Sequence, residues 1–259
     1  MDQTEPVTAQ IATWWQRVEI KRIVWIWLGM SVVLVIFALI VPARLMGTPA
    51  SPTMRAVEST MTIFSVAAAP VMALVLAVAV YSLVGWRSRG SEPPTGDGPP
   101  IRGNGRVTAT WMVVSSLLTM FALIWGLGEM QSLSAEASPG PNAMIVNVTG
   151  QQWVWTFSYP QNGNIESDQL YLPVNRQVVF HVTSRDVIHS FWVVELGIKV
   201  DANPGEVTKT GVLPDKLGTY TVRCAELCGL LHAHMETQAH VVNSADFSAW
   251  ITAQGGRAS

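Results

Sequence analysis

Three long stretches without a charged residue constrain this chain more than any other feature of its sequence. Residues 24–43, 59–86 and 107–128 contain no Asp, Glu, Lys, Arg or His. As a helix, each stretch is long enough to cross a hydrocarbon layer of roughly 30 Å. The chain is 49% hydrophobic and only 13% charged, and this apolar excess indicates that part of it lies in lipid. We therefore predict three transmembrane helices, at about residues 24–44, 59–86 and 107–129, within a transmembrane region of residues 23–130.

Basic residues beside these stretches predict the orientation of the chain in the membrane. Cytoplasmic segments are enriched in Lys and Arg. Such residues precede the first stretch and crowd the loop between the second and third: Arg17, Lys21, Arg22, Arg87, Arg89, Arg102 and Arg106. We therefore expect residues 1–22 to be a cytoplasmic N-terminal segment and residues 131–259 to be an exported domain. The chain would be a multi-pass protein of the cytoplasmic or inner membrane, with that domain on the outer face.

The first apolar stretch has an alternative interpretation as a cleaved signal peptide. It follows basic residues and precedes the small residues of positions 47–51, as a signal peptide does. Against this, twenty uncharged residues exceed the roughly 7 to 15 of a signal peptide's apolar region, and Asp2, Glu5 and Glu19 lie before them. The sequence leaves open whether this helix is retained.

After Asn142 the pattern changes to short runs of β-branched and aromatic residues separated by turn residues. These runs extend from AMIVNV at residues 143–148 to TQAHVVN at residues 237–243, and one of them is SFWVVELGIKV at residues 190–200. Each run predicts one strand. Their length and near-regular spacing predict an antiparallel β-sandwich or barrel. The segment that follows predicts a short helix with Ser244 as its N-cap. Two polar segments rich in Pro, Gly or Ser, residues 88–105 and 132–142, are predicted to be linkers.

The predicted exported domain contains both cysteines of the chain and a small excess of acidic residues. From Gln131 onward there are eleven Asp and Glu against seven Lys and Arg. This balance favours a basic partner and argues against nucleic acid. Cysteines in an exported domain are usually bonded to each other or to a metal.

One stretch gathers soft metal ligands: Cys224, Cys228, His232 and Met235 lie within twelve residues. Sulfur together with imidazole suits copper or zinc and excludes the hard cations. A zinc site takes four strong ligands, usually from Cys and His, and a mononuclear blue-copper site takes one Cys, two His and a weak Met. Two thiolates on one loop can instead each bridge a pair of copper ions, with His189 as a second imidazole. For an isolated pair of cysteines at this spacing, a local disulfide is the alternative.

Three motifs resemble subunit II of the haem-copper cytochrome oxidases. They are the Cys-x-Glu-x-Cys-x3-His-x2-Met run of residues 224–235, the DVIHSFW run of residues 186–192 and the aromatic run of residues 150–159. The likeness covers about residues 145–242 and extends to the PPIRGN approach to the third helix. It implies a membrane-anchored α + β fold: the N-terminal transmembrane helices followed by a cupredoxin-like Greek-key β-sandwich. It also implies a function, in which electrons from an external donor pass through a dinuclear copper (CuA) centre to haem in subunit I, where oxygen is reduced to water.

The resemblance implies six ligands for the copper pair. The two bridging thiolates would be Cys224 and Cys228, and the two imidazoles would be His189 and His232. The two weaker ligands would be Met235 and the backbone carbonyl of Glu226. The side chain of Glu226 would reach a Mg²⁺ or Mn²⁺ at the boundary with subunit I, and Asp201 would support that region. Trp153 would be the exposed aromatic residue where a cytochrome c docks and its electron enters. The implied partners are subunits I and III, cytochrome c or another small redox donor, and membrane lipid.

The sequence departs from the family's usual pattern in four features: the additional first helix, Thr108, Glu206 and His234. Two other functions remain as alternatives. A copper-free structural subunit of a quinol oxidase would lack some of the Cys or His ligands, which are all present here. A stand-alone membrane-tethered copper carrier would need neither the paired tryptophans nor Glu226 beside the thiols.

Overall fold

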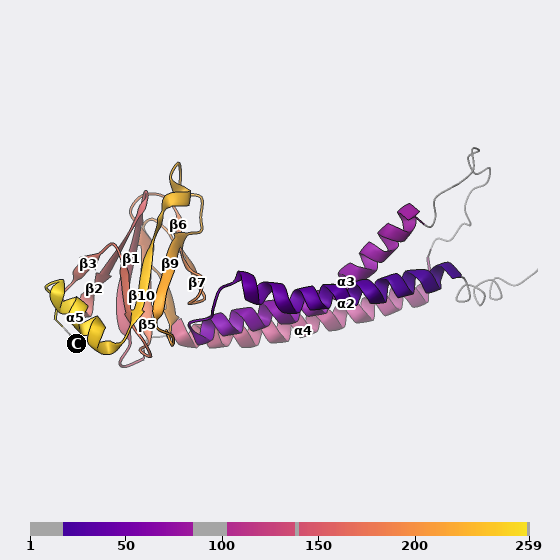
Figure 1. Ribbon diagram of the computed structural model, residues 1–259, viewed down its shortest axis with the longest axis horizontal. Coiled ribbons are helices and arrows are strands. Elements are labelled where there is room, and N and C mark those ends of the chain that lie inside the picture. Colours follow the sequence, from indigo (N-terminus) through magenta and orange to yellow (C-terminus); the bar gives the residue numbers. More distant parts are fainter. Residues whose placement is uncertain (1–17, 85–102, 138–139, 258–259) are drawn as a thin grey trace, which may run out of the picture. The chain divides into compact units, whose positions relative to one another are not determined.

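The structure, a computed structural model, describes residues 18–84, 103–137 and 140–257 (Figure 1). The described residues form two compact units. The helical unit lies within residues 1–42 and 61–122, and the unit with the β-strands lies within residues 43–60 and 123–259. The predicted domain limits of residues 1–22, 23–130 and 131–259 stay predictions. Some residues used to predict orientation or a linker lie outside the described residues: Arg17, Arg87, Arg89, Arg102 and most of the segment 88–105.

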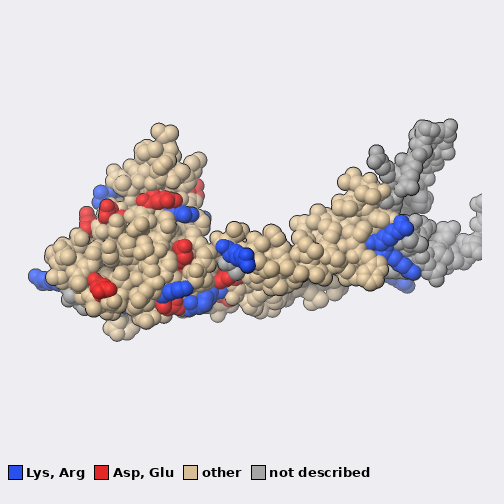
Figure 2. All heavy atoms as spheres, viewed as in Figure 1, with Lys and Arg blue, Asp and Glu red and all other residues tan. Residues whose placement is uncertain are grey.

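Among the described residues, three helices are long and apolar enough to cross a membrane: α2 (Val18–Leu45), α3 (Pro52–Val84) and α4 (Gly105–Ala137). In Figure 2, charged side chains gather on the β-strand domain and near the ends of the helices, and the helix surfaces between them carry few charges. The predicted order, apolar helices followed by a β-sandwich domain, is confirmed, and that all three helices cross a membrane stays a prediction. Within the helical unit, Trp27 Nε1 of α2 donates a hydrogen bond to the Pro70 carbonyl of α3 at 2.8 Å, so these two helices are in contact.

The second helix begins earlier than its uncharged stretch predicts. The Ser51 hydroxyl accepts a hydrogen bond from the Met54 N–H at 2.9 Å and caps the helix, and Pro52 occupies the first position, where no N–H donor is needed. A helix therefore starts at Pro52, although the charged Arg55 and Glu58 follow. The third helix also continues to Ala137, so the prediction of a linker is wrong for residues 132–137, whose Ser, Ala, Leu and Glu residues tolerate helix.

Ten strands in the described residues form two five-stranded sheets. One sheet has the order β3-β2-β1-β5-β8, with β1 (Met144–Gln151), β2 (Val154–Tyr159), β3 (Ile165–Ser167), β5 (Val178–Ser184) and β8 (Thr208–Val212). The other has the order β4-β10-β9-β6-β7, with β4 (Leu170–Pro173), β6 (His189–Val193), β7 (Ile198–Ala202), β9 (Gly218–Cys224) and β10 (Glu236–Val242). The pairs β1–β5 and β4–β10 are parallel, so the prediction of an antiparallel sandwich is wrong for them. Residue alternation within a strand specifies its faces but not its neighbour's direction. The Greek-key connectivity of a cupredoxin stays a prediction.

Three local expectations differ from the structure. The run SFWVVELGIKV divides into β6 and β7, because Gly197 adopts a φ of +67° and its N–H donates to the Val194 carbonyl at 2.9 Å, which closes a turn. The helix α5 (Ser244–Ala253) is capped by Asn243 rather than Ser244, since the Asn243 side chain accepts the Asp246 N–H. Strand β3, which has three residues, was not predicted.

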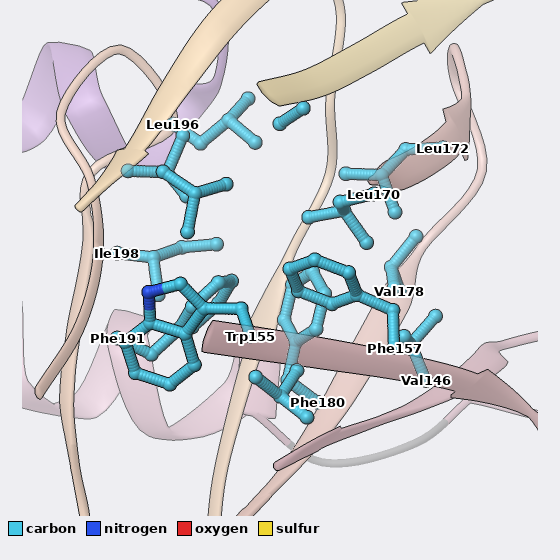
Figure 3. Close-up of a cluster of buried hydrophobic side chains, with 14 of the residues drawn as sticks. Val146, Trp155, Phe157, Leu170, Leu172, Val178, Phe180, Phe191, Leu196 and Ile198 are labelled. Atoms are coloured by element: carbon cyan, nitrogen blue, oxygen red, sulfur yellow. The ribbon is translucent and has the colours of Figure 1, made fainter. Parts of the chain in front are cut away.

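The core lies between the two sheets and fixes the strand that leads into the candidate site. Phe191 of β6 meets Trp155 and Phe157 of β2 and Phe180 of β5, with ring centroids 5.3 to 6.2 Å apart (Figure 3). All four rings are almost fully buried. Because β6 is held by this aromatic packing, His189, its first residue, has a fixed position.

The segment before α3 packs into the β-strand domain. The Ala50 N–H donates to the Glu195 carbonyl and the Ser51 hydroxyl donates to the Leu196 carbonyl, both at 2.8 Å. Ala50, Ser51 and Met54 are buried there. The turn between β6 and β7 is therefore held from outside by a part of the chain that lies about 145 residues earlier.

Candidate metal centre

Two free thiols form the middle of the candidate site. Cys224 is the last residue of β9 and Cys228 lies in the loop that follows, and both are buried. Their Sγ atoms are 3.7 Å apart, well beyond the roughly 2 Å of a disulfide bond. The structure therefore holds two separate sulfur ligands, not the local disulfide that was the alternative interpretation of this pair.

The imidazole of His189 reaches the thiols through strand pairing. Strands β6 and β9 are antiparallel neighbours, with Phe191 opposite Cys224. This pairing brings His189 Nδ1 to 3.9 Å from Cys224 Sγ, inside a fully buried position. Ligand atoms of His189, Cys224 and Cys228 all lie within 4.8 Å of one another. A residue 35 positions upstream thus completes a compact group of three ligands.

The other three predicted copper ligands surround the same two sulfurs. His232 Nδ1 is 3.5 Å and Met235 Sδ is 3.8 Å from Cys228 Sγ. The backbone carbonyl oxygen of Glu226 is 3.2 Å from Cys224 Sγ. His232 is half-buried in the short 3₁₀ helix η2 (His232–His234), whereas the Met235 side chain is fully buried. The loop therefore closes on itself around the thiols.

Asp186 holds the ring of His189 from the side away from the thiols. Its Oδ1 lies 2.8 Å from His189 Nε2, so the ionised carboxylate accepts a hydrogen bond from the ring N–H there and leaves Nδ1 free to bind a metal. Partial burial alone would raise the pKa of Asp186, but hydrogen bonds from the Gln152 N–H, from His189 and from the Val187 N–H lower that pKa to about 2. The sequence gives no distinctive signal for this contact, because a lone Asp in a polar turn is common.

The chemistry of this donor set fits a pair of copper ions. Two thiols, two imidazoles and a thioether are soft or borderline ligands, and the single carbonyl oxygen beside them is too few hard oxygens for Mg²⁺ or Ca²⁺. Burial, followed by the adjacent Cys224, raises the pKa of the Cys228 thiol to about 11, so without a metal this sulfur carries a proton at neutral pH. A soft metal ion would displace that proton and neutralise the buried thiolate.

Trp153 lies beside this loop, in the turn between β1 and β2. It is half-buried rather than exposed, and within the described part of the chain its buried Nε1 has no hydrogen-bond partner. Trp153 directly precedes β2, whereas Trp155 is the second residue of β2 and is buried in the core. A Cβ on Gly229 would lie 3.4 Å from the Trp153 indole, so the ring rests against the ligand loop.

Two predicted acidic residues stay apart from the thiols. Glu226 and Asp201 are exposed, and neither belongs to the group of converging ligands found among the described residues. Two other histidines also lie elsewhere: His240 packs against Tyr171 with ring centroids 4.6 Å apart, and His181 is in β5. Burial lowers the pKa of both imidazoles.

Three leucines of the ligand loop project into solvent. The exposed fractions of Leu227, Leu230 and Leu231 are 79%, 88% and 43%. We call these three residues the leucine tip. Large apolar side chains grouped at a surface are typical of a contact with another molecule.

Comparison with known proteins gives one consistent result. A model of the family described as "Cytochrome C oxidase subunit II, periplasmic domain" matches residues 164–242. The chain is 31% identical over 222 residues to cytochrome c oxidase subunit 2 of Thermostichus vulcanus, covering 66% of each chain. It is 30% identical over 208 residues to the corresponding subunit of Alkalihalophilus pseudofirmus, covering 78% of this chain and 60% of that one. The chain thus spans slightly less than two thirds of the length of these relatives.

A solved structure is also similar to part of the chain. The periplasmic domain of subunit II of cytochrome oxidase (CoxB) from Bradyrhizobium japonicum is 32% identical, with a TM-score of 0.42. The match covers 43% of this chain and 93% of that one.

Proposed function

Because the chain belongs to the family of cytochrome c oxidase subunit II, a component of the haem-copper oxidases, we propose that it is the subunit through which electrons enter. It takes electrons from an external donor at a dinuclear CuA centre and passes them to haem in subunit I, which reduces oxygen to water. The observation that carries this proposal is the convergence of His189, Cys224 and Cys228 within 4.8 Å, with His232 and Met235 next to the second sulfur.

Each ligand has a role that its position supports. Cys224 and Cys228 would hold both metals, since their sulfurs are side by side at 3.7 Å. His189 would bind on the side of Cys224 and His232 on the side of Cys228, because each imidazole lies next to that sulfur. Met235 and the Glu226 carbonyl would be the weaker ligands. When bound, a copper pair of this kind supplies reversible one-electron transfer.

The electron enters at Trp153, whose half-buried ring lies between the surface and the ligand loop. The donor is a cytochrome c or another small redox protein that covers this ring and the adjoining leucine tip. Arg223 and Glu236, beside the two ends of the ligand loop, form an ion pair at 3.2 Å, so these two charges are matched within the chain. The apolar surface of the leucine tip supports docking of the donor.

The remaining features concern the assembled oxidase. The helices span the cytoplasmic or inner membrane, with the copper-binding domain on the outer face and with subunits I and III as partners. The side chain of Glu226 is exposed, a position that allows it to reach a Mg²⁺ or Mn²⁺ at subunit I, near Asp201. Carboxylate oxygens are ligands that these cations prefer, and the apolar helix surfaces suit contact with lipid and with other subunits.

Metal analysis of the purified oxidase tests the function. We expect two copper ions per chain, a mixed-valence signal and co-purifying haem. Cys224→Ser and Cys228→Ser should each abolish the signal and the oxidation of the donor together, whereas Thr221→Ser on the same strand should preserve both. Survival of signal and donor oxidation in the two cysteine variants would reject the assignment.

The same analysis separates the alternatives. A complex that oxidises quinol and contains no copper in this chain would indicate the structural subunit of a quinol oxidase. One labile copper per chain without a haem-containing partner would indicate a membrane-tethered copper carrier.

A further inference from the structure

We propose that Gln152 is a positioning residue of the metal centre, which ties the loop carrying Cys228 and the segment carrying His189 to one turn. The inference rests on the proposed copper centre and assigns a role to a residue that supplies no ligand. Gln152 lies between β1 and β2, directly before Trp153.

The side chain of Gln152 makes the first tie. Its Nε2 donates a hydrogen bond of 2.7 Å to the backbone carbonyl of Cys228, 76 residues away in sequence. Cys228 is four residues past the end of β9, and its neighbours in the loop include the exposed Leu227 and Leu230. This carbonyl lies outside the hydrogen bonds of the sheet, and the side-chain amide of Gln152 is the donor that holds it.

The backbone of Gln152 makes the second tie. Its N–H donates to Asp186 Oδ2 at 2.7 Å, while Asp186 Oδ1 lies 2.8 Å from His189 Nε2. One residue therefore contacts both the loop that carries one sulfur and the carboxylate that orients the buried imidazole. These two groups belong to segments that approach the site from different strands.

Gly229 shows that the ligand loop is shaped around this amide. A Cβ at position 229 would lie 2.9 Å from Gln152 Nε2, closer than side-chain atoms pack. Gly229 also has a φ of +121°, a conformation that residues with a Cβ rarely adopt. The loop therefore approaches Gln152 at the position directly after Cys228, where a larger residue would push the amide away.

The tie near Cys228 sets the separation of the two sulfurs. The Cys224 end of the loop is held by backbone bonds, from the Cys224 N–H to the Met235 carbonyl and from the Ala225 N–H to the Ser190 carbonyl. The Cys228 end depends on the Gln152 amide as well. Without it, Cys228 Sγ is free to shift relative to Cys224 Sγ, which changes the geometry at both bound metals and weakens their retention.

Substitution of the amide tests this role in the purified oxidase. Gln152→Glu has the same shape, but its carboxylate cannot donate to the Cys228 carbonyl and repels it. Gln152→Met removes the donor without adding charge. Gln151→Glu, at the exposed last position of β1, is the control with the same change of charge. The measurements are the rate of copper loss to a chelator, the mixed-valence spectrum and the reduction potential.

Both Gln152 variants should lose copper about two- to tenfold faster, the factor that one ordinary hydrogen bond contributes to an equilibrium, and should show an altered spectrum. Gln151→Glu should match the unsubstituted protein. Copper loss and spectra unchanged in both Gln152 variants would overturn the proposal. Where Gln152→Glu does not assemble, Gln152→Met decides. Absence of copper from the unsubstituted oxidase is a different result, because it rejects the proposed function itself.

Discussion

At the scale of single residues, a negative charge beside His189 contributes to the properties of the centre. The Asp186 carboxylate is ionised at neutral pH because its hydrogen bonds lower its pKa to about 2, against the effect of partial burial. It accepts a hydrogen bond from the His189 Nε2–H and so orients Nδ1 toward Cys224. A carboxylate in this position makes the imidazole a better donor and favours the more highly charged, oxidised metal.

Asp186→Asn should therefore raise the reduction potential of the copper centre. The neutral amide removes the charge that favours the oxidised state. Its NH₂ group also cannot accept a hydrogen bond, so one of the contacts made by the two carboxylate oxygens is lost. Copper affinity should fall about 10- to 100-fold, the usual cost of losing such a partner. Redox titration and competition with a chelator measure both quantities. Asp168→Asn, an equal change of charge at an exposed residue, should leave them unchanged, and an unshifted potential in Asp186→Asn would contradict this role.

The sequence identified the converging candidate ligands better than it identified the residues that support them. Cys224, Cys228, His232 and Met235 lie on one loop, so their spacing alone brought them together. The positions of Gln152 and Asp186 depend on where β1 ends and on the pairing of β6 with β9, and a lone Gln or Asp in a polar turn has no distinctive pattern. The resemblance implied that Trp153 is exposed, whereas the structure places it half-buried in a turn.

At the scale of elements, the turn between β6 and β7 is shaped to receive the segment before α3. A Cβ on Gly197 would lie 2.7 Å from the Met54 backbone nitrogen and 2.9 Å from its Cα. Neither atom can move without disturbing the start of α3, where Ser51 also binds the Leu196 carbonyl. This contact explains why one predicted strand is two, since the glycine both reverses the chain and permits the approach.

Gly197→Ala should consequently destabilise the protein more than Gly205→Ala does. Both glycines have positive φ, of +67° and +77°, so alanine costs about 1–2 kcal/mol of backbone strain at each. Only Gly197 also faces backbone atoms, and the crowding should add about 1–3 kcal/mol. Thermal unfolding of the purified protein measures the difference. Equal unfolding midpoints for the two variants would show that the segment before α3 moves to accept the added methyl group without loss of stability.

At the scale of the whole molecule, composition predicted the division into helices and strands. Stretches without charge gave the three helices, because lipid and water impose different compositions on long segments. The ends of the helices were less predictable. They depend on caps such as Ser51 and Asn104, whose side chain accepts the N–H groups of Arg106 and Val107. The parallel strand pairs were not predictable from composition or alternation, since they join segments far apart in sequence.

Orientation in the membrane follows from where the positive charges lie, and two exposed positions test it. Thr48 precedes α3 and Gly103 precedes α4, so a single crossing by α3 places them on opposite sides. Arg102 and Arg106 flank Gly103, which favours the cytoplasmic side for it. A membrane-impermeant maleimide should label Thr48→Cys in intact cells and label Gly103→Cys only after permeabilisation. The chain without an added cysteine gives the background, because Cys224 and Cys228 are buried. Equal labelling of both positions in intact cells would mean that α3 does not cross the bilayer.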